Sequence, residues 1–509
     1  MKFRILGAVV AAAAGLTLTS SGGAVAVDNE ALTRDLDAIL AGPALVGADV
    51  GLVVRDANTG DVVYTRTSSR RQQIASNLKL LTTAAALDLL GPDYRWKTEL
   101  LSSGTRNGST LQGDLVLRGT GDPTMSQSRY AALATALKNS GVTKVSGSLV
   151  IDDTAFDSQP YGTGWAWDDE PFAYSAETSA LTLSPDAKFS AGTVLVRVKP
   201  GAAAGAPAVV TVEPENDRVH VVNTATTGSG SISIERDHGS NIIRVSGATN
   251  AEISPRLSTV KDPTALVTSV FRNALRANGI EVAGDVREAA APAGAAVLAS
   301  DQSQSLGQLI TPLLKNSNNM LAEVLVKTAG KSFGNGVNQL SSKWSGLGVN
   351  PNVVEIVDGS GMSRMNQVSP DDLTSILIKA KSKPWFATWE ASLPVAGVDG
   401  TLVNRMKNTA AAGNVKAKTG SLSGVSALTG YVKTRDNRDL VFSVVQNNVL
   451  LNFSPRTIED SIAVRLAEEG GTPSAPQIQS VPQQRTAGEQ EPKAGQERFD
   501  VECSWINAC

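Results

Sequence analysis

Three short polar motifs lie far apart in the chain, and each borders a strongly apolar segment. Residues 76–79 read Ser-Asn-Leu-Lys, residues 317–319 read Ser-Asn-Asn, and residues 418–420 read Lys-Thr-Gly. The first two motifs begin 317 − 76 = 241 positions apart, and the last two begin 418 − 317 = 101 positions apart. A fold that brings all three together must therefore accommodate a large insertion between the first and the second.

The first motif opens a segment with the composition of a buried helix. Residues 80–91 are rich in Ala and Leu and end at Gly91, which predicts a helix that stops at this glycine. Side chains three positions apart share one face of a helix, so Lys79 points where Ser76 points. Free backbone N–H groups and the positive end of the helix dipole lie beside Ser76. They would stabilise an oxyanion that forms there.

A second copy of the same spacing lacks this context. Residues 258–261 read Ser-Thr-Val-Lys, but Asp262 and Pro263 follow and do not continue a helix. A lone Ser-x-x-Lys is most often a helix cap with a solvated lysine. The presence of the other two motifs favours a functional interpretation of Ser76.

The second and third motifs also lie at the edges of predicted elements. Residues 317–319 precede residues 320–327, which have helical apolar spacing, so this motif is expected at the edge of a loop and a helix. Residues 418–420 lead into two β-like runs, 425–432 and 440–445, that predict a hairpin.

A Lys-Thr-Gly strand beside a cleft suits the binding of a carboxylate. Lys418 offers a cation and Thr419 a hydroxyl, while Gly420 lets the backbone come close to a substrate.

The chain has two histidines, His220 and His238, and both lie away from the motifs. We expect them on the surface. A Ser-His-Asp triad needs an imidazole beside the serine, and a zinc protease usually needs two or more histidines. The sequence therefore predicts no metal and no other cofactor. The predicted proton acceptor is Lys79, because an ammonium that is partly desolvated beside another cation, here Lys418, gives up its proton more readily.

The first residues have the pattern of an exported protein. Lys2 and Arg4 precede an apolar run over residues 5–18 and small residues at 24–26, which predicts a signal peptide over residues 1–26. No later stretch approaches the roughly 18 to 20 apolar residues of a spanning helix. We therefore expect a secreted, extracytoplasmic protein of the cell envelope without a transmembrane anchor.

The last residues predict a disordered tail. Residues 472–509 are rich in Gln, Pro, Glu and Gly, and maturation could remove them. Cys503 and Cys509 are the only cysteines and could close a small disulfide in an oxidising compartment. The formal net charge of −3 gives no reason to expect a nucleic acid or an anionic membrane as a partner.

Between the signal peptide and the tail lie 471 − 26 = 445 residues, which is too long for a single core. A predicted helix at 32–40 and a hairpin at 48–66 stand at one end, and the second hairpin with a helix at 458–466 stands at the other. Both ends together predict one antiparallel sheet with helices on its faces.

The chain resembles the low-molecular-mass penicillin-binding proteins of the D-Ala-D-Ala carboxypeptidase/endopeptidase type, serine peptidase family S13, in its actinobacterial branch. The resemblance covers about residues 30–470 and rests on the three motifs and four further segments. These are residues 118–124 (Arg-Gly-Thr-Gly-Asp-Pro-Thr), 169–175 (Asp-Glu-Pro-Phe-Ala-Tyr-Ser), 358–364 (Asp-Gly-Ser-Gly-Met-Ser-Arg) and 399–402 (Asp-Gly-Thr-Leu). One departure from the general Ser-Asp-Asn pattern is Asn318, which is usual in this branch.

The resemblance implies an α/β (α+β) architecture with a β-lactamase/transpeptidase-like antiparallel sheet flanked by helices and two nested, β-rich inserted domains. We expect a discontinuous catalytic domain of residues 27–98 and 306–471. The second domain is expected over residues 99–122 and 212–305, with the third nested in it over residues 123–211.

The resemblance also implies a carboxypeptidase that removes the terminal D-Ala from peptidoglycan stem peptides, often also cutting cross-links, through an acyl-enzyme on Ser76. Penicillins mimic the D-Ala-D-Ala end and are expected to acylate the same serine as covalent inhibitors.

Roles for the motif residues follow from the same resemblance. Lys79 activates Ser76, Ser317 passes the proton to the leaving amine, and Asn319 holds the acyl side of the substrate. Lys418 and Thr419 face its terminal carboxylate. The backbone N–H groups of Ser76 and Ser421 form the oxyanion hole.

Side-chain recognition is a separate hypothesis. Asp169 and Arg364 lie in matched segments and carry opposite charges, which suit the zwitterionic end of a diaminopimelate side chain. Tyr174 or Met362 would form the walls of such a site. The alternative is that Asp169 is an ordinary surface residue and Arg364 a structural one.

Two rival functions use the same motifs. A serine β-lactamase would hydrolyse its acyl-enzyme rapidly, but the large insertion and the lack of a recognisable deacylating carboxylate motif argue against it. A non-catalytic protein that binds the wall or β-lactams would have no need of intact motifs. The lifetime of the acyl-enzyme discriminates the first rival, and any turnover excludes the second.

Overall fold

The computed structural model describes residues 29–450 and 454–474. The predicted signal peptide, Cys503 and Cys509 lie outside the described residues, as does the tail beyond residue 474. Among the residues described, no helix combines the length and the apolar composition that crossing a bilayer requires.

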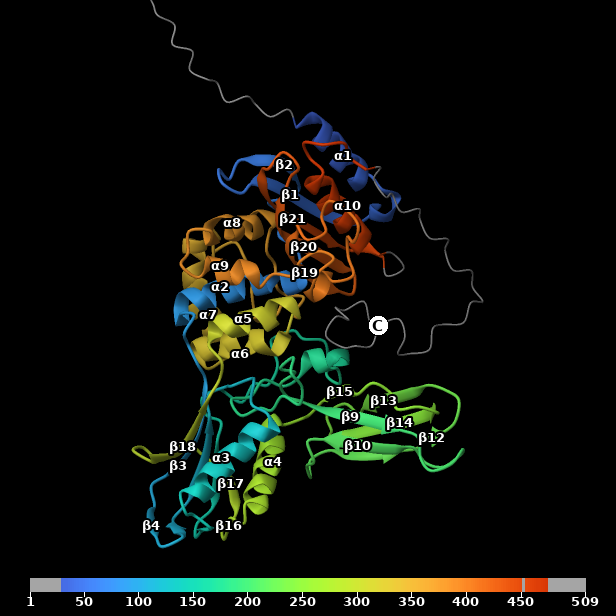
Figure 1. Cartoon of the computed structure of the whole chain (residues 1–509). Helices are drawn as coiled ribbons and strands as arrows, with labels where there is room; N and C mark the ends of the chain where they lie inside the picture. The colour runs from blue at the N-terminus through green and yellow to red at the C-terminus, as the bar shows by residue number, and fades with distance from the viewer. Residues whose placement is uncertain (1–28, 451–453, 475–509) are drawn as a thin grey trace, which may run out of the picture.

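The two ends of the described chain form one antiparallel sheet (Figure 1). Its strands run in the order β19-β20-β21-β1-β2, and β1 pairs antiparallel with β21 near the middle of the sheet. The strands are β1 (Asp49–Asp56), β2 (Val62–Arg66), β19 (Lys416–Leu422), β20 (Val425–Lys433) and β21 (Asp439–Asn447). The predicted antiparallel sheet, completed by both ends of the chain, is confirmed.

Each face of this sheet packs on helices, because successive side chains of a strand point to opposite faces. Phe442 and Val444 of β21 share a core with α1 (Glu30–Leu40) and α10 (Pro455–Ala467). Val441 and Val445 share another core with α2 (Leu78–Leu90) and α8 (Pro370–Ala380).

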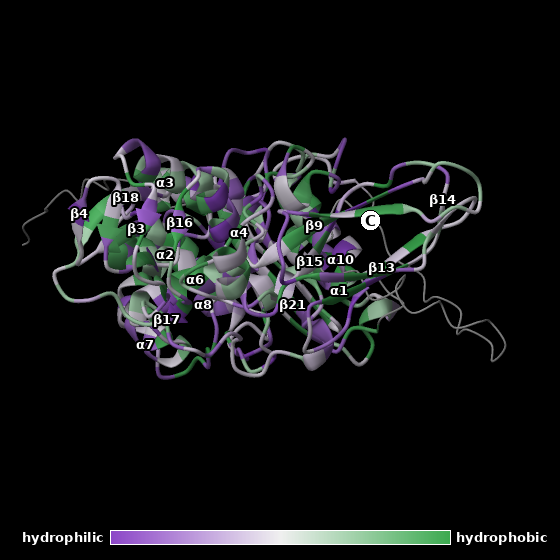
Figure 2. Ribbon diagram, turned by 90° about the horizontal axis from the view of Figure 1, so that it is seen from below, coloured by the Kyte–Doolittle hydropathy of each residue, from purple (hydrophilic) through white to green (hydrophobic). Residues whose placement is uncertain are grey.

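The α2 side of the sheet is the thicker one. Further helices pack around α2, and residues 78–87 of α2 are all buried. These helices are α5 (Leu306–Lys315), α6 (Asn319–Gly330), α7 (Phe333–Trp344) and α9 (Phe386–Ala391). A helix enclosed on every side needs apolar residues all round, and the ribbon of α2 is largely green in Figure 2. The helix ends at Gly91, whose φ of 81° lies in the left-handed region, as the sequence predicts.

The long interval between the first two motifs contains a second, mixed sheet. Its strand order is β17-β8-β6-β3-β18, and helices α3 (Gln127–Asn139) and α4 (Pro263–Ala277) pack against it. The strands are β3 (Lys97–Ser102), β6 (Leu115–Gly119), β8 (Leu149–Asp152), β17 (Val286–Glu288) and β18 (Ala296–Gln302). A small adjoining sheet contains β4 (Thr105–Asn107), β5 (Thr110–Gln112), β7 (Lys144–Val145) and β16 (Glu281–Val282).

A third unit of short strands forms the green lobe on the right of Figure 1. One of its sheets has the order β10-β9-β15, and in the other β14 pairs with β11, β12 and β13. The strands are β9 (Thr193–Lys199), β10 (Val209–Glu213), β11 (His220–Asn223), β12 (Thr226–Thr227), β13 (Ile232–Arg236), β14 (Ile242–Thr249) and β15 (Arg256–Thr259).

Strand pairing contradicts the predicted inner domain boundaries. The predicted third domain, 123–211, includes α3 and β8, but β8 pairs in parallel with β6 of the second sheet. The predicted second domain includes β15, which instead pairs with β9. Two parallel strands that are neighbours in a sheet need a crossover connection. Helix α3 provides this connection between β6 and β8, so the chain stays in the second unit through β8. We propose that the second unit spans residues 97–152 and 263–302, and the third spans residues 153–262.

Candidate active site

Ser76 lies in a tight turn at the start of α2. The turn is the 3₁₀ segment η2 (Ala75–Asn77), and Ala75 has a φ of 47°, in the left-handed region that a residue with a Cβ seldom adopts. Gly361 packs directly on this turn, because a Cβ at Gly361 would lie 2.0 Å from the carbonyl oxygen of Ala75. A strained turn held by close neighbours is a common feature of functional sites.

Lys79 is fully buried and directed at Ser76, as the helix spacing predicts. Its Nζ donates to Ser76 Oγ at 2.7 Å, to Asn319 Oδ1 at 2.6 Å and to the carbonyl oxygen of Ser360 at 2.9 Å. The oxygens of Asn319 and Ser360 hold the Nζ within hydrogen-bond reach of the Ser76 hydroxyl, which is the geometry that a general base needs.

The second motif contributes three side chains with different contacts. Ser317 has a φ of 54°, and its Oγ accepts from Lys418 Nζ at 2.8 Å. Asn319 is the first residue of α6, and its Nδ2 donates to the carbonyl oxygen of Tyr174 at 2.8 Å. The motif therefore joins the other two motifs and contacts the third unit.

Asn318 faces away from this cluster. Its Oδ1 caps α6 by accepting from the backbone N–H of Leu321, and its Nδ2 donates to the carbonyl oxygens of Lys188 and Phe189. Because both acceptors are carbonyls, an amide satisfies this position and a carboxylate would not. This geometry accounts for the departure from an aspartate in the middle of the motif.

The third motif lies on β19, beside the turn that carries Ser76. Lys418 is fully buried, and Thr419 Oγ1 donates to Thr401 Oγ1 at 2.8 Å. A Cβ at Gly420 would lie 2.6 Å from the carbonyl oxygen of Ile74, so glycine allows β19 to approach η2. Ser421 follows Gly420 on the same strand.

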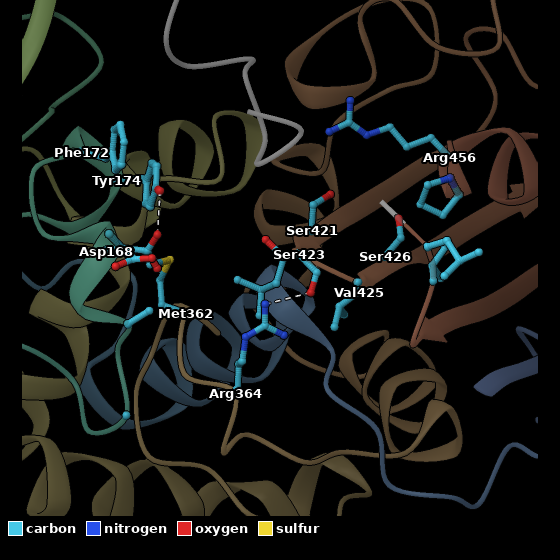
Figure 3. Close-up of a pocket in the computed structure, with 18 of the residues that line it drawn as sticks. Asp168, Phe172, Tyr174, Met362, Arg364, Ser421, Ser423, Val425, Ser426 and Arg456 are labelled. Atoms are coloured by element: carbon cyan, nitrogen blue, oxygen red, sulfur yellow. Dashed lines mark hydrogen bonds between the residues drawn. The ribbon is translucent and has the colours of Figure 1, made fainter. Parts of the chain in front are cut away.

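A cavity of about 430 Å³ adjoins the motifs through Ser421. Its lining includes Asp169, Tyr174, Met362 and Arg364, which the sequence hypothesis grouped at one recognition site. Figure 3 shows Tyr174 and Met362 at the left of the view and Arg364 near its centre, next to Ser423.

The cavity lining includes four charged residues, Asp168, Asp169, Arg364 and Arg456, and neighbouring groups orient Asp169 and Arg364. Asp169 Oδ1 accepts from the hydroxyl of Tyr174 at 2.8 Å. Arg364 donates from Nη2 to the carbonyl oxygen of Ser423 at 2.8 Å and from Nη1 to Gln73 Oε1 at 3.2 Å. The lining of one cavity thus carries both carboxylates and guanidiniums.

The sequence interpretation assigned no role to three residues that contact this site. Ser360 accepts from Lys79, Thr401 accepts from Thr419, and Glu323 accepts from the backbone N–H groups of Gly359 and Ser360 at 2.8 Å each. Ser360 and Thr401 lie in segments matched to the family. Glu323 is four residues after Asn319 on α6, and this helical spacing is the signal that could have revealed it.

The titration of Glu323 is strongly perturbed. Glu323 is fully buried, and burial together with the nearby Asp358 raises its pKa from the ordinary 4.5 to about 8, against the effect of its hydrogen bonds.

The histidines lie outside the motif cluster. His220 and His238 are exposed, and His238 stacks on Trp167 with ring centroids 3.7 Å apart. Within residues 29–450 and 454–474, no group of three or more His, Cys, Asp or Glu side chains is arranged to hold a metal ion.

Comparison with known proteins agrees with the geometry. Residues 32–469 match the family described as D-Ala-D-Ala carboxypeptidase 3 (S13). A D-alanyl-D-alanine carboxypeptidase of Actinomadura sp. is 41% identical over 500 residues, covering 94% of this chain and 90% of the relative. D-alanyl-D-alanine carboxypeptidase DacB of Haemophilus influenzae is 29% identical over 410 residues, or 78% and 85% of the two chains.

A solved structure shares the fold. The crystal structure of penicillin binding protein 4 (dacB) from Haemophilus influenzae superposes with a TM-score of 0.73 and 24% identity, covering 85% of this chain and 97% of the other. The extent of the family match and of the identity to the Actinomadura relative shows that the chain belongs to the D-Ala-D-Ala carboxypeptidase 3 (S13) family of serine peptidases.

Proposed function

We propose that this enzyme removes the terminal D-Ala from peptidoglycan stem peptides through an acyl-enzyme on Ser76. The observation that carries the proposal is the 2.7 Å contact between Lys79 Nζ and Ser76 Oγ, with the Lys418–Ser317 contact of 2.8 Å in the same cluster. The activity named for the Actinomadura relative supports the choice of reaction.

Acylation begins when Lys79, in its neutral form, takes the proton of the Ser76 hydroxyl. Ser76 Oγ attacks the carbonyl carbon of the penultimate D-Ala, and the carbonyl oxygen becomes an oxyanion. The backbone N–H groups of Ser76 and Ser421 receive this charge. The closeness of Gly420 to the η2 turn supports that pairing of donors.

Collapse of the tetrahedral intermediate breaks the bond to the terminal D-Ala nitrogen. Ser317 gives its hydroxyl proton to the departing amine, and the proton that Lys79 took from Ser76 returns to Ser317, so that Lys79 is neutral again. Lys418, whose Nζ lies 2.8 Å from Ser317 Oγ, keeps its own proton and orients this hydroxyl. In deacylation, water gives a proton to Lys79 and its oxygen attacks the ester carbonyl, and Lys79 then returns the proton to Ser76 Oγ as the ester bond breaks. A cross-linked peptide would react in the same way if its amine belonged to a second stem.

Three polar side chains of the site suit the two ends of the reacting peptide. Lys418 and Thr419 provide a cation and a hydroxyl for the terminal carboxylate, and Asn319 is positioned by Lys79 and Tyr174 to hold the acyl side.

The adjoining cavity suits the side chain of the stem peptide. Asp169 would receive the ammonium of a diaminopimelate end and Arg364 its carboxylate, with Tyr174 and Met362 as walls. The opposite charges of Asp169 and Arg364 in the lining of one cavity support this assignment.

Penicillins resemble the D-Ala-D-Ala end and would acylate Ser76 as long-lived covalent inhibitors. A peptidoglycan substrate requires an extracytoplasmic location, which the predicted signal peptide would provide.

The test uses a labelled penicillin and a D-Ala-D-Ala peptide with the mature protein. We expect long-lived label on the peptide that contains Ser76, and loss of both labelling and D-Ala release in Ser76→Ala. Rapid loss of label with destruction of the penicillin would identify a β-lactamase instead, and neither label nor release would identify a binding protein.

Ser258→Ala provides the matched control. Ser258 begins the second Ser-x-x-Lys and is buried on β15. This variant should keep both labelling and D-Ala release, so equal losses in the two variants would contradict the assignment of Ser76.

A further inference from the structure

The turn that carries Asp169 is bound to the third unit by its next residue. Asp169 ends the 3₁₀ segment η3 (Trp167–Asp169), and Glu170 follows it. Glu170 is not among the residues that line the cavity of Asp169 and Arg364, and its side chain contacts the hairpin of β13 and β14. Adjacent residues thus contact the substrate cavity and the outlying strands.

Glu170 is held by a preformed carboxylate site in that hairpin. Its Oε1 accepts from Arg236 Nη2 at 2.8 Å, and both carboxylate oxygens accept from the backbone N–H of Gly239, at 3.1 and 3.0 Å. His238 Nδ1 lies 3.1 Å from Glu170 Oε2. These groups surround the carboxylate with hydrogen-bond donors, as an anion site requires.

The backbone of Glu170 is fixed as well as its side chain. Its carbonyl oxygen accepts from Arg236 Nη2 and from Thr259 Oγ1, each at 3.0 Å. Arg236 Nε in turn donates to Thr259 Oγ1 at 2.9 Å, so two strands of the third unit, β13 and β15, and the turn after β13 converge on one residue.

The ion pair is well enclosed. The side chain of Arg236 is 1% exposed and that of Glu170 is 12% exposed. Beside the pair, Trp167 stacks on His238 with an interplanar angle of 11°. A buried, hydrogen-bonded pair defines geometry more strictly than a surface pair, because solvent cannot replace either partner.

We propose that the Glu170–Arg236 pair positions Asp169 for recognition of a zwitterionic substrate side chain, and that the third unit serves in this way as a specificity element. The inference rests on the proposed function of the cavity. Neither Glu170 nor Arg236 touches the reacting atoms, so both are positioning residues.

The proposal predicts a selective defect. If the pair is broken, Asp169 loses its fixed position while the Ser76, Lys79 and Lys418 cluster stays intact. Turnover of a peptide with a zwitterionic side chain should then fall, and turnover of a peptide without one should not. Loss of one charge-assisted hydrogen bond to the substrate corresponds to about a tenfold change or more in relative kcat/KM.

The experiment measures kcat/KM for D-Ala release from two D-Ala-D-Ala peptides, one with a diaminopimelyl side chain and one with an uncharged chain of similar length. Wild type, Arg364→Ala, Arg236→Gln and Glu170→Gln are compared, and acylation by a penicillin is measured in each. We expect the preference for the zwitterion to fall about tenfold in Arg236→Gln and Glu170→Gln, with penicillin acylation within about twofold of wild type.

Arg244→Gln is the matched control. Arg244 belongs to the same hairpin and pairs with Asp237, but this pair is exposed and joins β14 to the turn without contacting Glu170. The control should keep the wild-type preference. If Arg236→Gln does not fold, Glu170→Gln still decides the question, because it removes the charge and keeps the shape of the side chain.

The outcomes separate this inference from the proposed function. If the wild-type enzyme shows no preference between the two peptides, both the proposed function of the cavity and the positioning role are overturned, since the cavity then does not recognise the side chain. If Arg364→Ala abolishes the preference but Glu170→Gln and Arg236→Gln retain it, only the positioning role is overturned. If the variants lose kcat/KM equally on both peptides and lose penicillin acylation to the same extent, the pair serves stability alone. That result also overturns the positioning role.

Discussion

At the scale of single residues, the reactive cluster depends on close contacts that only certain side chains permit. Lys79 and Lys418 are buried and surrounded by hydroxyl, amide and carbonyl oxygens, which replace the water that each ammonium gives up. Glycines supply the space between the elements that carry these groups. The positions of Ser76 and Lys79 are therefore sensitive to residues that never touch a substrate.

Substitution of Gly361 should damage acylation. Gly361 has a φ of 88°, and a Cβ there would overlap the carbonyl oxygen of Ala75 at 2.0 Å. The Ala75–Ser76 turn must then move, and a displacement of about 1 Å can cost about 100-fold in rate. We expect Gly361→Ala to lower penicillin acylation of Ser76 by about this factor, measured by stopped-flow labelling.

Gly413→Ala separates steric overlap from backbone strain. Gly413 also has a positive φ, 71°, but a Cβ added there would have no other atom within 4 Å. This control should lose only about 1 to 2 kcal/mol of stability from left-handed strain and keep its acylation rate. If both variants acylate at the wild-type rate, the contact of Gly361 with Ala75 does not position Ser76.

Glu323 should make stability depend on pH. Its pKa is raised from 4.5 to about 8 in the folded protein by burial and by Asp358. Between these values the folded state keeps a proton that the unfolded state loses. The contribution to stability is therefore fully present below about pH 4.5 and is lost as the pH rises through about 8.

The measurement is the free energy of unfolding at pH 5, 6, 7 and 8 for wild type and Glu323→Gln. The wild type should lose up to about 1.4 kcal/mol per pH unit relative to the variant. Glu235→Gln, at an exposed position of β13, should follow the wild-type curve. Parallel curves for wild type and Glu323→Gln would show that Glu323 keeps an ordinary pKa.

At the scale of elements, α6 connects the reactive cluster with its supports. Asn319 contacts Lys79, Glu323 accepts from the 359–360 backbone, and Lys327 contacts Asp157. These residues are four positions apart, so they share one face of the helix. Before them, Asn318 caps the helix and donates to two carbonyl oxygens of the third unit.

Position 318, the middle of the second motif, should accept an amide side chain but not a carboxylate. Asn318→Asp keeps the cap on Leu321 but turns a carboxylate oxygen toward the carbonyls of Lys188 and Phe189. Two hydrogen bonds are lost, and we expect a loss of about 2 to 3 kcal/mol in the free energy of unfolding by urea.

Ser332→Asp is the control for the added charge. Ser332 caps the neighbouring helix α7 by accepting from Asn335, and an aspartate is a good cap whose charge favours a helix start. The stability of the Ser332→Asp variant should be equal to that of wild type or slightly higher. A loss as large as that of Asn318→Asp would mean that charge, rather than the two carbonyl contacts, causes the effect.

The elements and the motifs could be predicted from the sequence because their signals are local. Apolar spacing and Gly91 define α2, and alternation defines the β20–β21 hairpin. The inner domain boundaries could not be predicted, since β6 and β8 pair only after the chain has passed through the crossover helix α3. Glu323 was missed for a similar reason: its four-residue spacing from Asn319 places it on the same helix face, but the sequence does not show that the backbone of residues 359 and 360 lies against that face.

At the scale of the whole molecule, the third unit is attached along the same helix that bears the second motif. Residues 157–189 contact α6 at its start through Asn318 and Asn319 and near its end through Lys327. Figure 1 shows the strands of the third unit extending away from the main sheet. Asp168 and Asp169, which line the cavity, lie between these two attachment points in the sequence, so we expect the docking of the third unit to affect the shape of the cavity.

Lys327 is the part of this attachment that can be tested without touching the reactive cluster. Its side chain is fully buried, and Nζ donates to Asp157 Oδ1 at 2.7 Å and to the carbonyl oxygen of Gln159, beneath the ring of Phe333 at 4.8 Å. In Lys327→Met the carbonyl and the carboxylate lose their donor, although Asp157 is 39% exposed and can be hydrated. We expect a loss of about 1 to 3 kcal/mol in the free energy of unfolding.

Hydrogen exchange distinguishes local undocking from general destabilisation, because each amide reports the opening of its own region. In Lys327→Met, protection should fall in residues 157–177, whereas β19, β20 and β21 should exchange as in wild type. Lys343→Met, which removes a less buried lysine from α7, should leave both regions unchanged. Uniform loss of protection across the main sheet and the third unit would mean that the molecule opens as one body, and that Lys327 supports the whole core rather than the docking of the specificity element.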